Sequence, residues 1–362
     1  MYLKKIIPTF KIFTLGCKVN QYESSRLAAE LAGFGFEKAP NDSEADVYIV
    51  NTCTVTAEAA RKTRQAIRRF SEKHTSALVY ALGCAAEIPD VALANVNGNV
   101  RFITNKGKAG LAREIAAEFG LLSFNKNFLY EAERTRALLK VQDGCDNFCS
   151  YCIIPYVRGR STSREPEDIL KELNEIEKKG FGEVVLTGIH LGDYGKNTKA
   201  GLSLAALVKY LLEGSSINRI RLSSLEPMDF SLELLKLFAA NKRLCRHLHL
   251  PLQHGSDKIL KLMRRNYTLL DFDKIVKAAV ETVPGMTITT DVLIGFPGET
   301  EEDFNITYNY IKNTPIYRLH VFPFSSHRGT VAARLPEHLG RREKKKRAAS
   351  LIALGREKQS SI

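Results

Sequence analysis

Apolar and polar residues follow one another along the first third of the chain in a pattern that predicts strands and helices in turn. The helical stretches are amphipathic, as where Leu27, Leu31 and Phe34 fall on one face. Strands and helices in this order build βαβ units, so residues 8–122 predict a doubly wound domain on a parallel sheet. The predicted strands are the short apolar runs at 11–17, 46–52, 77–83 and, more weakly, 100–104.

The alternation stops at a polar stretch, 123–127, which predicts a linker, and it restarts at 137. Six further βα units of one parallel sheet predict an open, partial TIM-like barrel over 135–335. A basic helical tail is expected over 336–362. The fold class is therefore α/β, with a doubly wound parallel-sheet domain before a partial (β/α)6 barrel. The predicted barrel strands are 137–142, 183–188, 218–224, 247–252, 286–294 and 317–323.

Three cysteines, Cys145, Cys149 and Cys152, follow the first predicted barrel strand within eight residues. Three thiolates can hold three irons of a four-iron, four-sulfur cube and leave the fourth iron open to a non-protein ligand. The alternative is a zinc loop, but zinc loops usually pair Cys-x-x-Cys with a second pair of Cys or His ligands. No fourth ligand stands beside this set, so the spacing favours an iron–sulfur cluster with a catalytic role.

A second set of three cysteines, Cys17, Cys53 and Cys84, comes at the ends of three predicted strands of the first domain. Ligands of open α/β sheets gather outside the carboxyl ends of the strands, so the three thiols are expected to converge. The alternative is that they are core thiols, because Cys is often buried. Three equivalent positions favour a second cluster. Cys245 receives no role.

Charge and composition bear on partners and compartment. The 362 residues include 53 Lys and Arg against 40 Asp and Glu, a net charge of +13, which favours a polyanion such as nucleic acid. Arg61, Arg64 and Arg68 share one helix face and are the candidate nucleic-acid contacts; a solvated cationic face is the alternative. No apolar run reaches the roughly 18 to 20 residues of a membrane helix, and thiols that must stay reduced fit the cytoplasm.

Longer motifs extend these observations. The chain resembles the radical S-adenosylmethionine (SAM) methylthiotransferases over nearly its whole length, and among them the group acting on threonylcarbamoyladenosine in tRNA. His254 departs from the pattern, since the tRNA groups often have Ser there. The resemblance rests on the motifs Thr14–Ser24, Asn51–Thr56, Ile153–Arg160, Leu186–Gly195, Arg221–Pro227, His249–Asp257 and Asp291–Glu299.

The resemblance implies a chemistry for the two cysteine sets. The Cys145 set would hold the 4Fe-4S cluster that cleaves SAM, and the Cys17 set a second 4Fe-4S cluster where sulfur is methylated. The product would be a methylthio group on the adenine next to the anticodon. Family members place an aromatic near the SAM adenine, which points to Tyr151. Further candidate SAM contacts at strand ends are Gly188, Ser224, Glu226, Gln253 and Gly295.

The same resemblance implies the partners: the tRNA anticodon stem-loop and an electron donor such as flavodoxin or ferredoxin, with the enzyme a monomer. Alternative substrates are isopentenyladenosine in tRNA and a ribosomal-protein side chain. A remote alternative is an iron–sulfur electron-transfer or binding module. Family members end in a small RNA-binding barrel, the TRAM domain. About forty residues follow the last predicted barrel strand, and from Arg342 they predict a basic helix rather than short strands, so that domain is expected to be absent from this chain.

Overall fold

The computed structural model describes residues 7–41, 43–88, 96, 98–125 and 135–360. The chain divides into two compact units, each considered separately below. The first comprises residues 1–134 with Tyr156–Arg158, and the second comprises Thr135–Pro155 with Gly159–Ile362. The described residues include no helix that is both long and apolar enough to cross a membrane.

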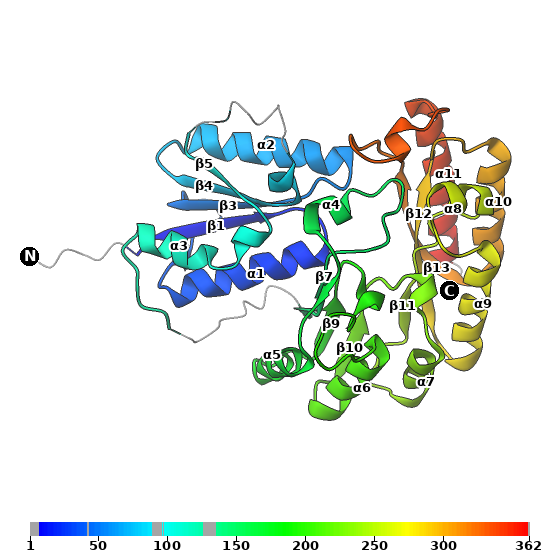
Figure 1. The fold of residues 1–362 in the computed structure, drawn as a ribbon, viewed down its shortest axis with the longest axis horizontal. Helices are drawn as coiled ribbons and strands as arrows, with labels where there is room; N and C mark the ends of the chain where they lie inside the picture. The colour runs from blue at the N-terminus through cyan, green and yellow to red at the C-terminus, as the bar shows by residue number, and fades with distance from the viewer. Residues whose placement is uncertain (1–6, 42, 89–95, 97, 126–134, 361–362) are drawn as a thin grey trace, which may run out of the picture. The chain divides into compact units, whose positions relative to one another are not determined.

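The first unit is a five-stranded parallel sheet with helices on both faces (Figure 1). The strands are ordered β2-β1-β3-β4-β5, the order of a doubly wound sheet whose switch point lies between β1 and β3. The elements of this sheet are β1 (Thr9–Thr14), α1 (Lys18–Gly33), β2 (Glu37–Lys38), β3 (Val47–Thr52), α2 (Ala57–Lys73), β4 (Leu78–Gly83), β5 (Val100–Ile103) and α3 (Leu111–Glu118).

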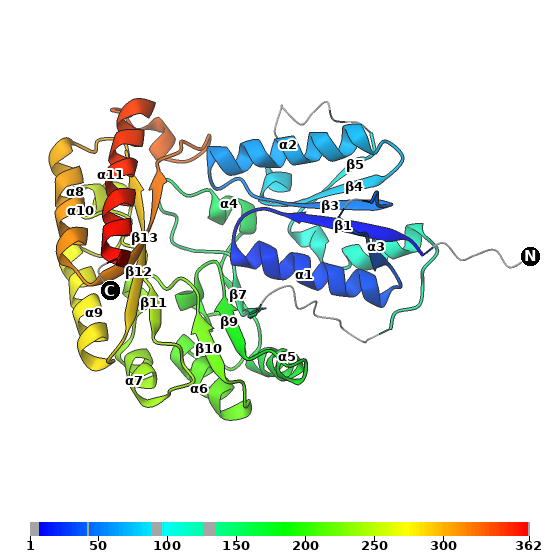
Figure 2. The same cartoon turned by 180° about the vertical axis from the view of Figure 1, so that it is seen from behind.

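Strand alternation explains how the sheet is covered. In β3 every residue is buried, with Val47 and Ile49 facing α1 and α3 while Val50 packs under Ile67 of α2. Figure 2, the view from behind, shows that α1 and α2 lie on opposite sides of the sheet. Phe124, in the predicted linker, packs on Phe34 at 4.8 Å between ring centroids. Residues 126 and 127 of that linker lie outside the described residues.

The second unit carries six parallel strands in one curved series. Backbone hydrogen bonds join β6-β9-β10 and β11-β12-β13, and a parallel bridge between Ser224 and His249 connects the two groups. No strand pairing joins β6 to β13 within the described residues, so the barrel is open between them. The six strands are β6 (Ala137–Lys140), β9 (Glu183–Thr187), β10 (Arg219–Leu222), β11 (His247–His249), β12 (Thr287–Ile294) and β13 (Ile316–Pro323).

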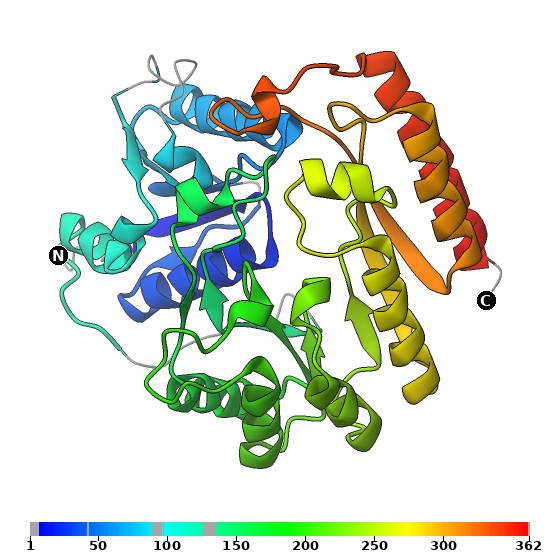
Figure 3. The same cartoon turned by 45° about the vertical axis from the view of Figure 1, so that its right-hand side comes forward.

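Helices cover the outer side of this sheet. In Figure 3, α10 and α11 run beside β13, and α11 packs directly on that strand. A short antiparallel pair, β7 (Gln142–Asp143) and β8 (Thr162–Ser163), flanks the cysteine loop. α4 (Ile154–Arg158) begins in the second unit and ends in the first. The other helices are α5 (Pro166–Lys178), α6 (Leu204–Gly214), α7 (Leu232–Ala240), α8 (Asp257–Leu262), α9 (Leu269–Thr282), α10 (Glu301–Asn313) and α11 (Arg341–Ser360).

The α/β class predicted from the pattern is confirmed, with parallel sheets in both units. Several strands end earlier than predicted, most of all in the runs 11–17, where β1 ends at Thr14, and 247–252, where β11 ends at His249. Pro251 has no N–H to give to a ladder, and Gln253 adopts a φ of 61°, which turns the chain out of the strand.

Candidate active site

The loop that carries Cys145, Cys149 and Cys152 is shaped by Gly144. This glycine has a φ of 72°, and a Cβ there would clash with the carbonyl of Arg160. The loop is closed by bonds from Cys145 N to Gly159 O (3.1 Å) and from Cys152 N to Cys149 O (3.0 Å). All three thiols are free and partly buried.

A buried arginine lies against this cysteine set. Arg265 donates through Nη1 to Cys149 Sγ at 3.2 Å and through Nη2 to Glu226. Burial raises the pKa of Cys149, and the guanidinium opposes that rise. Arg265 was missed by sequence reasoning because it follows Cys149 by more than a hundred residues and belongs to no short motif.

His190 is the second charged neighbour of the loop. Its Nε2 lies 2.6 Å from Asp229 Oδ2, and its Nδ1 lies 3.8 Å from Cys145 Sγ. Burial lowers the pKa of His190, but its hydrogen bonds to Asp229 and Cys145 outweigh burial and raise the pKa to about 10. The Asp229 carboxylate therefore favours the protonated form of the imidazole that lies beside the first cysteine of the loop.

The Cys17 set lies at the ends of β1, β3 and β4, as predicted from their strand-end positions. Cys53 and Cys84 are buried, whereas Cys17 is exposed. A Cβ on Gly16 would meet Cys53 Sγ at 2.9 Å, so only glycine lets the Cys17 turn approach that closely. Burial raises the pKa of Cys53 to about 11, and the neighbouring thiols Cys84 and Cys17 add to that rise. The three thiols thus share one environment at the sheet's switch point.

A polar network supports this set within the first unit. The Arg158 guanidinium is 1% exposed and donates to Asn20 Oδ1 and, at 3.1 Å, to Glu23 Oε1. Lys108 Nζ reaches Glu23 Oε2 at 2.6 Å. Arg158 also lowers the pKa of Cys84 against the effect of burial. The buried Arg158 guanidinium and the half-buried Lys108 ammonium share one carboxylate here, so the surroundings favour a negatively charged group on the thiols.

The donor sets fit iron–sulfur clusters. Six of the seven cysteines fall into two sets of three free thiols, and each set has a buried arginine close to one of its thiols. Three thiolates leave one iron of a cube without a protein ligand. Cys245 lies apart, where its sulfur accepts from Arg219 Nε at 3.4 Å, and it fills a structural position.

The predicted SAM contacts stand at the carboxyl ends of the barrel strands, but several are already engaged. Glu226 pairs with Arg265, and Tyr151 packs edge-on against Phe296 at 6.4 Å. Gly295 N donates to Glu299 Oε2 at 2.5 Å. Gly188 abuts Gln142, since a Cβ there would meet Oε1 at 2.7 Å. Exposed Ser224 and half-buried Gln253 stand at the ends of β10 and β11.

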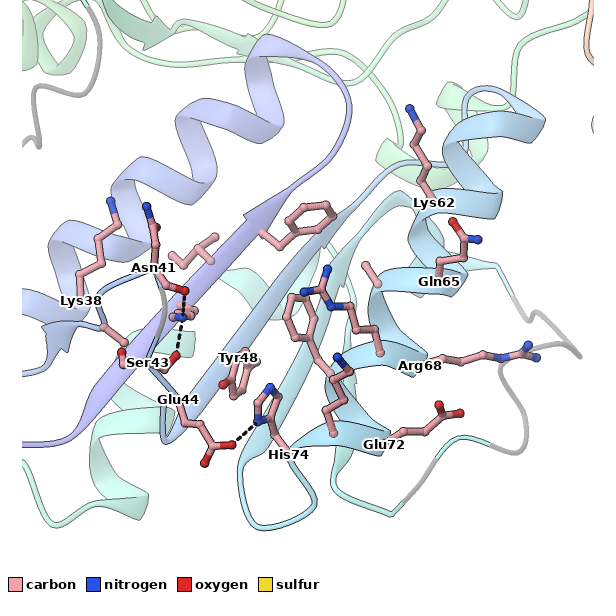
Figure 4. Close-up of a pocket in the computed structure, with 18 residues that line it drawn as sticks. Lys38, Asn41, Ser43, Glu44, Tyr48, Lys62, Gln65, Arg68, Glu72 and His74 are labelled. Atoms are coloured by element: carbon pink, nitrogen blue, oxygen red, sulfur yellow. Dashed lines mark hydrogen bonds and ion pairs between the residues drawn. The ribbon is translucent and has the colours of Figure 1, made fainter.

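The predicted nucleic-acid face lies on α2. Arg61 forms an ion pair with Glu58, with 2.6 Å between Nη2 and Oε1. Arg68 lines a hollow of about 1250 Å³ beside the helix. Figure 4 shows Lys62, Gln65 and Arg68 along α2, with the Arg68 side chain pointing away from Glu44 and His74. Six Lys and Arg line the hollow against two Glu, which makes it cationic. In the tail, Arg347 is buried in ion pairs with Glu299 (2.6 Å) and is a structural residue.

Two protein-family models match this chain, one in each of the two units. A model of the Radical SAM superfamily matches residues 139–311, and one described as Uncharacterized protein family UPF0004 matches residues 9–105. The chain is 37% identical to threonylcarbamoyladenosine tRNA methylthiotransferase MtaB of Bacillus subtilis, over 96% of this chain and 80% of that protein. It is 33% identical to tRNA-2-methylthio-N(6)-dimethylallyladenosine synthase of Pelotomaculum thermopropionicum, over 95% and 81%.

Among solved structures, the fold is similar to the radical SAM methyltransferase TsrM from Kitasatospora setae, with a TM-score of 0.61 and 16% identity over 91% of this chain and 77% of that one. That likeness concerns the fold. The two family models match the doubly wound unit and the barrel with its cysteine loop, and the methylthiotransferase relatives align with both units. The chain belongs to the radical SAM methylthiotransferase family, whose members are transferases that depend on SAM and a [4Fe–4S] cluster.

Proposed function

We propose that this enzyme adds a methylthio group to N6-threonylcarbamoyladenosine next to the tRNA anticodon, using two [4Fe–4S] clusters. The observation that carries the proposal is the pair of cysteine sets, each with its own buried arginine, in two separate units. Transferring a methylthio group needs a place to generate the radical and a place to hold the sulfur. Two clusters in one chain supply both.

The relatives support the choice of substrate. Four threonylcarbamoyladenosine methylthiotransferases are 37–38% identical to this chain, and four dimethylallyladenosine synthases are 33–34% identical. The difference is small but has the same direction in every pair. The sequence motifs around Cys17 and Cys53 favour the same group.

In the mechanism proposed, Cys145, Cys149 and Cys152 hold the radical-forming cluster. When bound, that cluster and SAM supply the one-electron chemistry that breaks an unreactive C–H bond. Arg265 offsets negative charge at Cys149, and the His190 imidazolium does so at Cys145. Tyr151, Gly188, Ser224, Glu226, Gln253 and Gly295 are the proposed surroundings of SAM at the barrel rim.

Cys17, Cys53 and Cys84 would hold the second cluster, which would supply the place for the sulfur to be transferred. Asn20 fixes the turn after Cys17 by donating to Leu15 O and Thr52 O, both at 2.8 Å. It also accepts from Arg158, so the cation is oriented by the same residue that shapes the turn. These contacts keep the site rigid before the group binds.

The proposed partners follow from this chemistry. The anticodon stem-loop of tRNA is the substrate, and Arg61, Arg64 and Arg68 on α2 contact its phosphates. A flavodoxin or ferredoxin supplies electrons to the radical-forming cluster, and the enzyme acts as a monomer in the cytoplasm.

The test is a direct assay. Anaerobically reconstituted enzyme receives SAM, reductant, sulfide and an anticodon stem-loop carrying either threonylcarbamoyladenosine or isopentenyladenosine. Mass spectrometry of the nucleosides should find the methylthio product from the first substrate. A product from the isopentenyl substrate alone would replace this proposal with the sibling activity.

A further inference from the structure

The inner face of the barrel carries a cluster of polar side chains that includes none of the cysteines. His249 of β11, Asp291 of β12 and His320 of β13 come together there. Asp291 Oδ1 lies 3.2 Å from His249 Nε2 and 3.0 Å from His320 Nδ1. Burial raises the pKa of Asp291, but its bonds to the two imidazoles outweigh burial and lower it to about 2, so the carboxylate is ionised.

Strand alternation shows which way these residues face. Leu319 packs on the outer side, since a Cβ on Gly355 of α11 would meet it at 3.3 Å. His320 is the next residue along β13 and therefore points to the inner side, away from α11. Arg318 lies two residues before His320, on the same inner side, in register with Thr289.

Two of these inner side chains, those of Arg318 and His320, are exposed and can contact a ligand. Arg318 is exposed, and it forms no ion pair or hydrogen bond through its side chain within the described part of the chain. The His320 side chain is 43% exposed, and Nδ1 is the nitrogen that Asp291 engages. β13 is the edge strand of the open barrel, so its inner side chains are next to the opening.

We infer that Arg318 and His320 bind the carboxylate of the threonylcarbamoyl group and thereby select this substrate; the inference rests on the proposed function. The threonylcarbamoyl group brings a carboxylate, a hydroxyl and ureido N–H groups, whereas an isopentenyl group brings only hydrocarbon. A guanidinium pairs with a carboxylate through two parallel hydrogen bonds. Asp291 holds His320 in place and can accept from a donor on the same group.

The experiment compares Arg318→Gln with the wild type on two anticodon stem-loops, one with the free threonyl carboxylate and one with its methyl ester. Esterification should reduce wild-type kcat/KM about 10- to 100-fold, the range expected for losing a charged hydrogen-bonded pair. Arg318→Gln should lower kcat/KM for the free acid by the same factor, and its kcat/KM for the ester should be close to that of the wild type for the ester. Arg356→Gln, an exposed arginine on α11, is the matched control and should resemble the wild type.

Iron content and SAM cleavage without tRNA should be unchanged in Arg318→Gln, which separates recognition from misfolding. If Arg318→Gln matches the wild type on the free acid, or loses equally on both substrates, the carboxylate inference is overturned while the proposed function stands. A wild type that modifies only the isopentenyl stem-loop overturns both. An additional stoichiometric metal that is lost in Asp291→Asn would make the cluster a metal site and also overturn the inference.

Discussion

At the scale of single residues, the cysteines could be assigned from sequence and their charged neighbours could not. Cys145, Cys149 and Cys152 share one short motif, so spacing alone predicted them as a set. Arg265 and His190 reach the same loop from other parts of the barrel. Arg265 belongs to no motif, and the motif Leu186–Gly195 contains His190 without showing which cysteine it contacts. Short motifs report residues that are close along the chain, whereas the electrostatic surroundings of a site come from tertiary contacts.

Asp303 illustrates a buried charge whose effect depends on pH. Its carboxylate accepts from Ser256 at 2.6 Å and Lys258 at 2.8 Å, and it closes the capping box with Thr300. Burial raises its pKa, but these hydrogen bonds outweigh burial and lower it below the ordinary value. A lowered folded pKa adds stability above the unfolded value of about 3.9, and this is lost as the pH falls through the folded pKa.

We therefore expect Asp303→Asn to lower the free energy of unfolding by about 1 to 3 kcal/mol at neutral pH. The difference in free energy of unfolding between the variant and the wild type should shrink below pH about 4, because the stability that the Asp303 carboxylate adds to the wild type is lost there. Urea unfolding across pH checks this, with Glu302→Gln as the control because Glu302 is an exposed carboxylate in the same first turn. A gap that does not change with pH would show that Asp303 contributes through packing alone.

At the scale of elements, the apolar runs located the long strands well, since burial on both faces makes parallel strands continuous in sequence. The register of β12 and β13, which brings Asp291 opposite His320, could not be read from either strand. The short helices α4 and α8 were not specified either, because five or six residues are too few to show a helical period.

The cysteine loop depends on one glycine. Gly144→Ala should lower iron content by about half, because a Cβ would clash with Arg160 and displace one of two proposed cluster sites. Gly180→Ala is the matched control: Gly180 also has a positive φ, 84°, but nothing lies within 4 Å of its Cβ position. In both variants the left-handed backbone costs about 1 kcal/mol. Equal iron content in the two variants would show that the lack of a side chain at Gly144 is not needed for the cluster site.

At the scale of the whole molecule, the sequence predicted two α/β units because the strand and helix pattern restarts after a polar stretch. Which strands face one another inside the barrel was not predictable, since His249, Asp291 and His320 are joined only by the curvature of the sheet. The net charge of +13 indicated a polyanion, but it could not show which surface meets it.

A salt titration of tRNA binding tests the proposed RNA face. The triple change of Arg61, Arg64 and Arg68 to Ala should lower the slope of log K against log salt by up to about three, roughly one for each phosphate that is no longer neutralised. The control removes three exposed cations from the second unit, Lys209, Lys236 and Arg356, and has the same net charge. Equal slopes in the two triple variants would show that the α2 face contributes only general charge.

The central claim is that the two cysteine sets divide the work, and Cys53→Ala tests it most directly. With reductant, SAM, sulfide and the threonylcarbamoyladenosine stem-loop, SAM cleavage and the methylthio nucleoside are measured in the same reaction. Because Cys53→Ala removes only the sulfur-holding site, deoxyadenosine should still form while the methylthio product disappears. Cys152→Ala should abolish both. Wild-type amounts of methylthio product from Cys53→Ala would contradict the account.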